Sequence, residues 1–266
     1  MQGIRYKVAG ENRATAGFTL IEMIIVIVIL GIVGLIISHI INSATRGYQS
    51  RAAMKELQSS GRLALDYLEL ELRYAVPNSV RVFDENGDVP EDDEPGPTLE
   101  FGRMIFGGLY DDDTSSGNDM VVVDDLSGKD FTSKRTWLVV YNTGPADFYA
   151  GNNSYVITDI DPVDDKWRIS CATDIDFSHH DPPRYYICDS AVKVTKNGDG
   201  LIYFSGYNPT SGAKNHGKFL CRKVESVSFV LQHSQAAEPT VFITLELKSG
   251  SLPLTLKRQV RLVNFH

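Results

Sequence analysis

Residues 17–41 read GFTLIEMIIVIVILGIVGLIISHII, and this stretch decides how the 266-residue chain is organised. Between Phe18 and Ile41 the polar interruptions are few: Thr19, Glu22, Ser38 and His39. A helix of this length spans roughly 36 Å, which is enough to cross a hydrocarbon core about 30 Å thick. We therefore predict a membrane-embedded helix over residues 18–41.

The residues before this run set its orientation. Residues 1–17 are polar and carry Arg5, Lys7 and Arg13 against Glu11 alone, which predicts a cytoplasmic N-terminus and a periplasmic remainder. An ordinary secretory signal has a shorter apolar region followed by a small-residue cleavage site, for which residues 42–44 (Asn-Ser-Ala) are poor. Hydropathy alone leaves an uncleaved signal anchor as the alternative.

Glu22 separates these alternatives, because a carboxylate near the start of a membrane helix costs a few kcal/mol and usually has a function and a partner. Gly17-Phe18-Thr19-Leu20-Ile21-Glu22, with a basic leader before it and an apolar helix after it, resembles the cleavage and methylation motif of type IV prepilins and of type II secretion pseudopilins. The resemblance implies an inner-membrane, pilin-like subunit with a class III leader.

The same resemblance implies roles for single residues. Gly17 is the last residue of a cleaved leader over residues 1–17, and Phe18 becomes the N-methylated N-terminus. Glu22 pairs with the free amine of Phe18 on a neighbouring subunit; both charges are costly to bury alone and tolerable together. The competing interpretation is a Glu22 that snorkels to the headgroups. The implied partners are a prepilin peptidase and methyltransferase, other major and minor pilins, and the inner-membrane assembly platform.

Helical periodicity continues beyond the membrane run. Small and apolar residues recur at spacings of three and four: Leu57, Gly61, Ala64, Leu68, Leu72 and Ala75. Pro77 ends the pattern. We predict one helix from about Phe18 to Ala75, with an amphipathic half over residues 42–76 packed on the globular domain. Gly31 and Gly34 are either merely tolerated or allow close helix packing or local melting in a fibre.

Residues 77–266 are predicted to form a β-rich periplasmic domain. The expected strands are Ser79–Phe83, Met120–Val123, Thr136–Tyr141, Tyr155–Thr158, Arg168–Cys171, Tyr185–Ile187, Lys193–Thr195, Leu201–Phe204, Val224–Gln232, Val241–Leu247 and Leu254–Asn264. Turn sequences at residues 197–200 and 249–251 indicate hairpins. The acidic segment 84–97 is expected to be an exposed loop. The predicted fold is α+β and pilin-like, a long helix packed on a mostly antiparallel sheet.

Further motifs resemble one group of minor pilins. Residues 137–144 (WLVVYNTG), 149–151 (YAG), 184–186 (RYY), 203–207 (YFSGY) and 257–261 (KRQVR) are similar to the large O-type minor pilins of MSHA (mannose-sensitive haemagglutinin) pilus biogenesis. This resemblance implies a low-abundance subunit that helps initiate or cap a pilus. In that group a cysteine pair falls near Lys196 and Val227, where this chain has none, so no disulfide is carried over.

The three cysteines lie in the C-terminal half, and the periplasm favours disulfides. Cys171 and Cys188 close the shortest loop and are the preferred pair. Cys188 with Cys221 is the next choice, and three free, mostly buried thiols are the third.

Composition and motifs argue against catalysis and nucleic-acid binding. The net charge is −8, whereas phosphate binding needs clustered cations. Three acidic groups, 84–88, 111–119 and 159–165, could hold calcium, but solvated loops are the simpler interpretation. His179 and His180 lack a partner pair at zinc spacing. We find no nucleotide loop, nucleophile elbow or zinc-protease helix, and expect no enzyme, cofactor or metal.

Three functions therefore compete. The first is a minor type IV pilin that primes or caps a pilus, with Glu22 and Phe18 joining neighbouring subunits. The second is a J-type minor pseudopilin of type II secretion. The third is a membrane-anchored binding module, for which an aromatic cluster of Tyr203, Phe204 and Tyr207 would supply a recognition surface if it were exposed.

Overall fold

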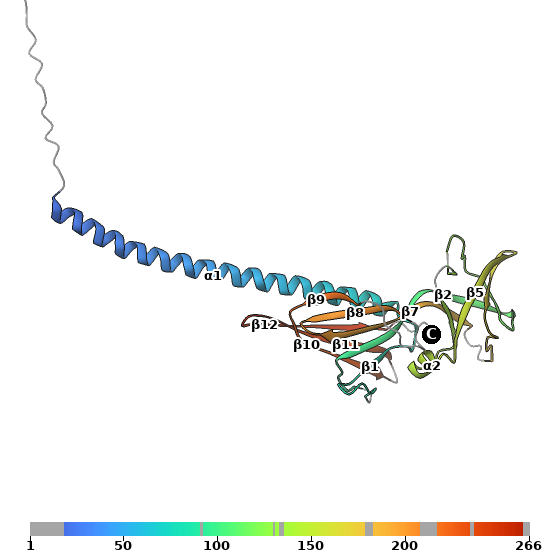
Figure 1. Ribbon diagram of the computed structural model, residues 1–266. Helices are drawn as coiled ribbons and strands as arrows, with labels where there is room; N and C mark the ends of the chain where they lie inside the picture. The colour runs from blue at the N-terminus through green and yellow to red at the C-terminus, as the bar shows by residue number, and fades with distance from the viewer. Residues whose placement is uncertain are drawn as a thin grey trace, which may run out of the picture. The chain divides into compact units, whose positions relative to one another are not determined.

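The computed structural model describes residues 19–90, 93–129, 131–132, 136–178, 183–207, 217–234 and 237–262. Its elements, in chain order, are α1 (Leu20–Arg73), β1 (Arg81–Phe83), β2 (Thr98–Ser116), β3 (Asp119–Val122), β4 (Trp137–Val140), α2 (Pro145–Ala150), β5 (Ser154–Val163), β6 (Lys166–Cys171), β7 (Arg184–Asn197), β8 (Gly200–Tyr207), β9 (Lys218–Arg222), β10 (Val224–Ser234), β11 (Ala237–Ser249) and β12 (Leu252–Arg261). This long helix followed by antiparallel strands confirms the predicted α+β, pilin-like arrangement (Figure 1). The chain divides into two compact units, residues 1–52 and 53–266.

In the first unit, the described chain beyond Thr19 is the N-terminal part of α1. The side chains of residues 20–41 are all exposed, although nearly all are apolar. The helix runs through Gly31 and Gly34 without a break. By length and composition it is able to cross a membrane once.

In the second unit, the C-terminal part of α1 is a packed helix. Its buried residues are Leu57, Gly61, Ala64, Leu65, Leu68 and Leu72, which confirms the stripe read from the sequence. Gly61 allows a close approach to the sheet, because a Cβ there would lie 2.6 Å from methyl groups of Leu247 and Leu256. The helix ends at Arg73, four residues before Pro77.

One layer beside α1 is the sheet β10-β11-β12, which is antiparallel throughout. The strands β11 and β12 keep a continuous register from Thr240 opposite Arg261 to Ser249 opposite Leu252. Their turn contains Gly250 at a φ of 61°, as residues 249–251 predicted. The side chains that point toward α1 include Val241, Ile243, Leu245 and Leu247, all buried.

The second sheet contains nine strands and closes partly on itself. The first half of β2 and the second half of β7 pair with each other. β1 lies beside β2, β8 lies beside β7, and β9 lies beside β8. The other halves of β2 and β7 join β3, β6, β5 and β4, and each of these six strands pairs with two others of the set. Six strands therefore form a closed antiparallel ring, which lies toward β5 in Figure 1.

The change from open sheet to ring happens at irregularities in the β2–β7 pairing. Its register shifts between Arg103 and Met104 and again between Met104 and Phe106, opposite residues 187–190. Bulges bend a strand and raise its twist, which lets one strand serve two sheets. The end of α1 is fixed to the same place, because Ala75 bridges Arg103 and the N–H of Met104 donates to the carbonyl of Tyr74.

The buried side chains fall into separate clusters. The largest lies between α1 and the two sheets and includes Leu68, Phe101 and Phe229. A second fills the ring and includes Met120, Ile169 and Tyr185. A third, built around Phe148 and Tyr149 of α2, covers one side of the junction. Each architectural part of this unit thus has an apolar core of its own.

Two parts of the strand prediction were wrong. The longest strand, β2, was not predicted, nor were β9 and the short helix α2. The expected strands 185–187 and 193–195 are one strand, β7, which is long because it belongs to both the open sheet and the ring. The strand β2 was missed because it contains Gly102, Gly107 and Gly108, and glycine usually weakens a strand.

Candidate assembly site at the start of the long helix

The first turn of α1 is closed by a reciprocal cap. The N–H of Glu22 donates to Oγ1 of Thr19 at 3.4 Å, and the N–H of Thr19 donates to Oε2 of Glu22 at 3.5 Å. This Thr-x-x-Glu arrangement is a capping box, in which two otherwise unpaired helical N–H groups are satisfied. The carboxylate also lies at the positive end of the helix dipole.

Glu22 is therefore held beside the main-chain N–H of the residue that directly follows Phe18. Gly17 and Phe18, the predicted cleavage and methylation positions, lie outside the described residues. The structure thus places one member of the predicted assembly pair at the helix start. The charge pairing between Glu22 and a neighbouring Phe18 remains a prediction.

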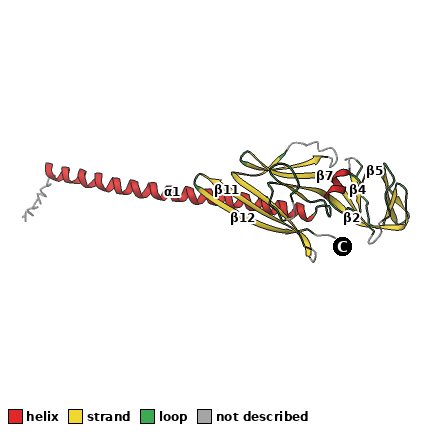
Figure 2. Ribbon diagram, turned by 90° about the horizontal axis from the view of Figure 1, so that it is seen from below, coloured by secondary structure: helices red, strands yellow, loops and turns green. Residues whose placement is uncertain are grey.

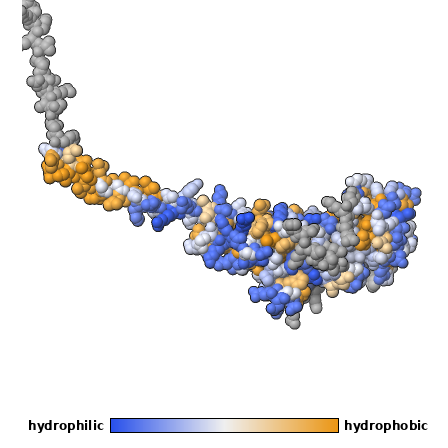
Figure 3. Space-filling view, in the orientation of Figure 1, coloured by the Kyte–Doolittle hydropathy of each residue, from blue (hydrophilic) through white to orange (hydrophobic). Residues whose placement is uncertain are grey.

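The helix that follows Glu22 has no apolar partner among the described residues of its unit. The side chains of residues 20–41 are exposed, with Leu20 at 80% and Leu35 at 75%. Figure 3 shows this apolar surface gathered over the first part of α1. Around Gly31 and Gly34 no atom of the described residues lies within 4 Å of an added Cβ, so no described contact requires glycine at either position. Water is a poor solvent for such a surface, and a lipid or a neighbouring helix is a good one.

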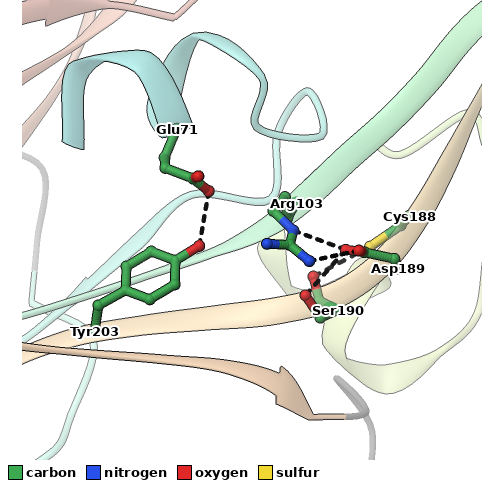
Figure 4. Close-up of polar contacts among 6 residues, drawn as sticks. All are labelled: Glu71, Arg103, Cys188, Asp189, Ser190 and Tyr203. Atoms are coloured by element: carbon green, nitrogen blue, oxygen red, sulfur yellow. Dashed lines mark hydrogen bonds and ion pairs between the residues drawn. The ribbon is translucent and has the colours of Figure 1, made fainter. Parts of the chain in front are cut away.

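At its other end, α1 is tied to the globular domain by polar contacts. The hydroxyl of Tyr203 on β8 donates to Glu71 of α1 at 2.7 Å (Figure 4). The ring of Tyr67 packs edge-on against Tyr203. Burial, and then the contact with Glu71, raises the pKa of Tyr203, so the phenol remains protonated. Sequence periodicity indicated the apolar stripe of α1 but not these partners, which lie more than a hundred residues away.

The strand junction next to this contact is braced by an ion pair. Arg103 of β2 donates to Asp189 of β7 through Nε at 2.9 Å and Nη2 at 2.5 Å (Figure 4). Ser190 also donates to Asp189, and the thiol of Cys188 donates to the carbonyl of Ser190 at 3.4 Å. A bidentate, part-buried pair of this kind fixes geometry as well as charge. It holds β2 and β7 at the place where they pass from the open sheet into the ring.

A second buried ion pair lies on β1 and β2. Glu100 is 6% exposed and accepts from Arg81 through Nε at 2.8 Å and Nη2 at 2.5 Å. The hydroxyl of Tyr207 donates to the same carboxylate, and the Arg81 guanidinium stacks over the ring of Tyr149 at 3.4 Å. The carboxylate is thus fully paired, which is what burial of a charge requires. We assign this cluster to the stability of the sheet.

The cysteine prediction needs correction. Cys171, Cys188 and Cys221 are free and buried, and each belongs to a different apolar cluster. Strands β5 and β4 separate β6, which carries Cys171, from β7, which carries Cys188. Cys171 belongs to the cluster that fills the ring, whereas Cys188 belongs to the cluster around α2, so the two thiols face different cores. The preferred pair is therefore not formed, and the third alternative, three buried thiols, is the one observed.

Burial also makes these thiols unreactive. It raises the pKa of Cys171 and Cys188 to about 12 and that of Cys221 to about 11. Since the thiolate is the nucleophile and the metal ligand, none of the three is suited to catalysis or to metal binding at neutral pH.

The first acidic group forms a hydrogen-bonded turn. Oδ1 of Asp84 accepts from the N–H groups of Asp88 at 2.8 Å and Asn86 at 2.9 Å, with Gly87 at a φ of 89°. These bonds, that from Asp88 foremost, lower the pKa of Asp84. The carboxylate oxygens that would face a cation are therefore already used by the chain itself.

The other two acidic groups lie largely on strands of the ring, which corrects their assignment to loops. Asp111 pairs with Lys166, Asp119 accepts from Ser170 at 2.7 Å, and Asp161 lies opposite Arg168 in the β5–β6 register. Among the residues that the structure describes, no three potential ligands gather in a metal-binding group. His179 and His180 are outside these residues.

The aromatic cluster considered for ligand recognition is mostly core. Tyr203 and Tyr207 are each 3% exposed, and only Phe204 is partly open. The hydroxyl of Tyr203 donates to Glu71 of α1, and the hydroxyl of Tyr207 donates to Glu100. These residues therefore offer no exposed aromatic platform of the kind that sugar binding uses.

Comparison with known proteins identifies the start of the chain. The family described as prokaryotic N-terminal methylation motif matches residues 12–38, a range that contains Gly17, Phe18 and Glu22. Neither the curated proteins nor the solved structures gave a match. The matched motif is structural and not catalytic, and it implies processing by a prepilin peptidase and assembly with other pilins. Together with the exposed apolar helix, it supports a protein of the type IV pilin or pseudopilin family with a single-pass membrane anchor.

Proposed function

We propose that this chain is a minor type IV pilin, of the MSHA type, that initiates, primes or caps a pilus. The observation that carries the proposal is the exposed apolar first part of α1, with Glu22 in its first turn, four residues after Phe18 in the sequence. The matched methylation motif spans residues 12–38, which include Gly17, Phe18, Glu22 and most of this apolar part.

The proposed sequence of events starts in the inner membrane. A prepilin peptidase cleaves after Gly17, and residues 18–41 remain as the anchor, with the globular domain in the periplasm. The new amine of Phe18 and the carboxylate of Glu22 are each expensive in lipid. Pairing Glu22 with the Phe18 amine of a neighbouring subunit removes both costs and places the apolar surfaces of two helices together.

The size of the globular unit supports a minor role. The globular unit contains the two sheets that cover α1. It also contains the six-stranded ring, which is formed by residues between the first half of β2 and the second half of β7. Such bulk would be repeated at every layer of a fibre if this were the major subunit. At the tip of a fibre a globular unit of this size occurs once, and no further layer of subunits restricts the space around it.

Processing provides the first test. The full chain is expressed with and without a prepilin peptidase, and the N-terminus and intact mass are determined. We expect peptidase-dependent loss of residues 1–17 and a product that begins at Phe18. A product that keeps its leader, or that is cut near Ala44, would leave a signal-anchored or secreted β-domain in place of a pilin.

The role of the Glu22 charge is tested by a matched pair of variants. Glu22→Gln retains a capping-box side chain but loses the charge, whereas Glu22→Ala loses both. We expect both variants to be cleaved and both to be absent from sheared fibres, measured by immunoblot against the wild-type chain. Normal incorporation of Glu22→Gln would show that the cap, and not the charge, is what assembly needs.

The matched motif is shared with pseudopilins, so a J-type role in type II secretion is the second candidate. Deletion of the chain separates the two. Loss of surface pili with normal export of secreted enzymes favours the pilus, and the reverse phenotype favours secretion.

A further inference from the structure

Among the residues that the structure describes, the outer edge of β12 is a long sheet edge with no strand paired to it. Among the described residues, β12 pairs with β11 alone. The opposite edge of the same sheet is covered, because Gly96 and Phe229 exchange two main-chain hydrogen bonds and the N–H of Asp93 donates to Leu231. The edge strands of the other sheet, β1 and β9, span only 3 and 5 residues.

The register shows which groups of β12 face outward. The N–H of Leu262 donates to the carbonyl of Pro239, the residue opposite it, so even-numbered residues of β12 direct their N–H and C=O toward β11. Odd-numbered residues then direct theirs to the open edge. Pro253 lies at such an odd position, where a missing N–H costs no ladder bond. The free donors are Thr255, Lys257, Gln259 and Arg261, and no described residue pairs with their main chain.

The edge strand β12 has a regular register, and two of its apolar side chains that face the core are only partly buried. The ladder between β11 and β12 has no register shift over ten residue pairs, whereas the β10–β11 and β2–β7 ladders both contain shifts. The inward-facing Leu254 and Leu256 are only partly buried, although they pack on the main core. Their counterparts on β11, Leu245 and Leu247, are completely buried. An additional strand would cover the two leucines and leave no ladder group unpaired.

The other face of β12 sets the charge of the expected partner. Lys257 and Arg261 are exposed, and Thr255 and Gln259 alternate with them. In an antiparallel pair, directly opposite side chains of opposite charge stabilise the pairing and like charges oppose it. A strand beside β12 is therefore favoured when it carries acidic residues on this face and apolar residues on the face toward Leu254 and Leu256.

We propose that β12 is a docking edge for one extended strand of another subunit. That strand is amphipathic, with acidic residues at alternate positions, and it extends the sheet β10-β11-β12 by main-chain pairing. Figure 2 shows β12 on the outer side of this sheet, beside β11. This proposal goes beyond the proposed function. It rests on the proposed function in one respect, namely that other subunits contact this domain. Lys257 and Pro253 are also residues that protect edges from unwanted pairing, and in this structure they select an acidic strand and fix where it ends.

The test uses the full chain in detergent micelles and a labelled ten-residue peptide of alternating glutamate and valine, blocked at both ends. Binding is measured by fluorescence anisotropy, and amide hydrogen exchange is followed residue by residue. We expect saturable binding that slows exchange at Thr255, Lys257 and Gln259 but leaves the already protected Leu256 and Arg258 unchanged. The same peptide with lysine in place of glutamate should bind about tenfold more weakly or not at all.

Gln259→Pro is the decisive variant, because it removes an outward N–H without removing a bond to β11. Its matched control, Gln259→Thr, keeps the N–H. We expect Gln259→Pro to weaken peptide binding at least about tenfold and Gln259→Thr to leave it unchanged. If Gln259→Pro fails to fold, the pair Lys257→Glu and Arg261→Glu keeps the test open, since it should reverse the preference between the glutamate and lysine peptides.

Three outcomes would overturn the proposal: no saturable binding of the glutamate peptide, equal binding by Gln259→Pro and Gln259→Thr, or protection spread over β12 without the alternation. None of these readouts depends on leader cleavage or on Glu22. Failure of the docking edge therefore leaves the pilin assignment intact, and failure of processing leaves the docking edge to be judged by its own data.

Discussion

Both the N-terminal and the C-terminal part of α1 carry many apolar side chains, but the two parts differ in how far those side chains are buried. Residues 20–41 expose theirs, whereas Leu57, Leu65, Leu68 and Leu72 are at most 2% exposed against the two sheets. The same contrast appears in the glycines: Gly61 has leucine methyl groups against it, and Gly31 has open space. One helix thus contains a segment whose apolar side chains are buried by the fold and a segment whose apolar side chains are exposed in the described structure, as suits a membrane or another subunit.

The largest effect should come from shortening a buried leucine. Leu68→Ala is expected to lower the free energy of unfolding by about 2–5 kcal/mol, because it leaves a cavity between α1 and the sheets. The matched variant Leu30→Ala should change it by less than about 0.5 kcal/mol, since Leu30 is 63% exposed. Thermal unfolding in detergent, followed by far-UV circular dichroism, measures both. Equal losses would mean that residues 20–41 contribute to the folded core.

The glycine pair sharpens the contrast with a smaller effect. Gly61→Val places a side chain within 2.6 Å of Leu247 and Leu256, so we expect a loss of about 1–3 kcal/mol in the same unfolding experiment. Gly31→Val meets nothing within 4 Å and should leave unfolding unchanged. If Gly61→Val were also neutral, α1 would have room to shift away from the sheet, and the close approach would not be a constraint.

The smallest effect concerns pH and is confined to the globular unit, which contains all three cysteines. Their folded pKa values of about 11 to 12 exceed the ordinary value of 9.0, so above pH 9 the unfolded chain loses thiol protons that the folded chain keeps. Stability due to these groups is complete below about pH 8 and falls as pH rises through 9 toward 12. At pH 9 the loss relative to pH 7 should be about 1 kcal/mol.

Thiol counting provides the control for that prediction. Without reductant, a thiol reagent at pH 8 should label no cysteine of the folded chain and all three after denaturation. A single labelled cysteine after denaturation would mean that a disulfide had formed and that the strand arrangement around β6, β4 and β7 is different.

The features that sequence predicted well are those that local chemistry controls. The apolar run, the periodic stripe of α1 and the end of the helix before Pro77 follow from side-chain spacing and backbone limits within a few turns. The turn at Gly198 was found for the same reason, because a positive φ of 61° favours glycine whatever surrounds it.

The longest strand escaped prediction because its unusual residues have tertiary reasons. Gly102 is required where the ring of Phe148 lies 2.4 Å from the site of a Cβ, and Gly108 where Asp124 lies 1.9 Å from it. Read alone, glycines and the aspartates 111–113 argue against a strand. Their contacts come from α2 and from the segment after β3, which no local pattern could associate with β2.

By itself, the sequence determined that a long helix begins after Phe18, that its first part is too apolar for water, and that Glu22 occupies its first turn. These properties depend on neighbours along the chain and on transfer of side chains from water. Only the tertiary structure decided that β2 and β7 serve two sheets, that the cysteines lie on separated strands, and that β12 is left with an open edge. These depend on pairing between residues far apart in sequence, and one residue's shift in register would change every such neighbour.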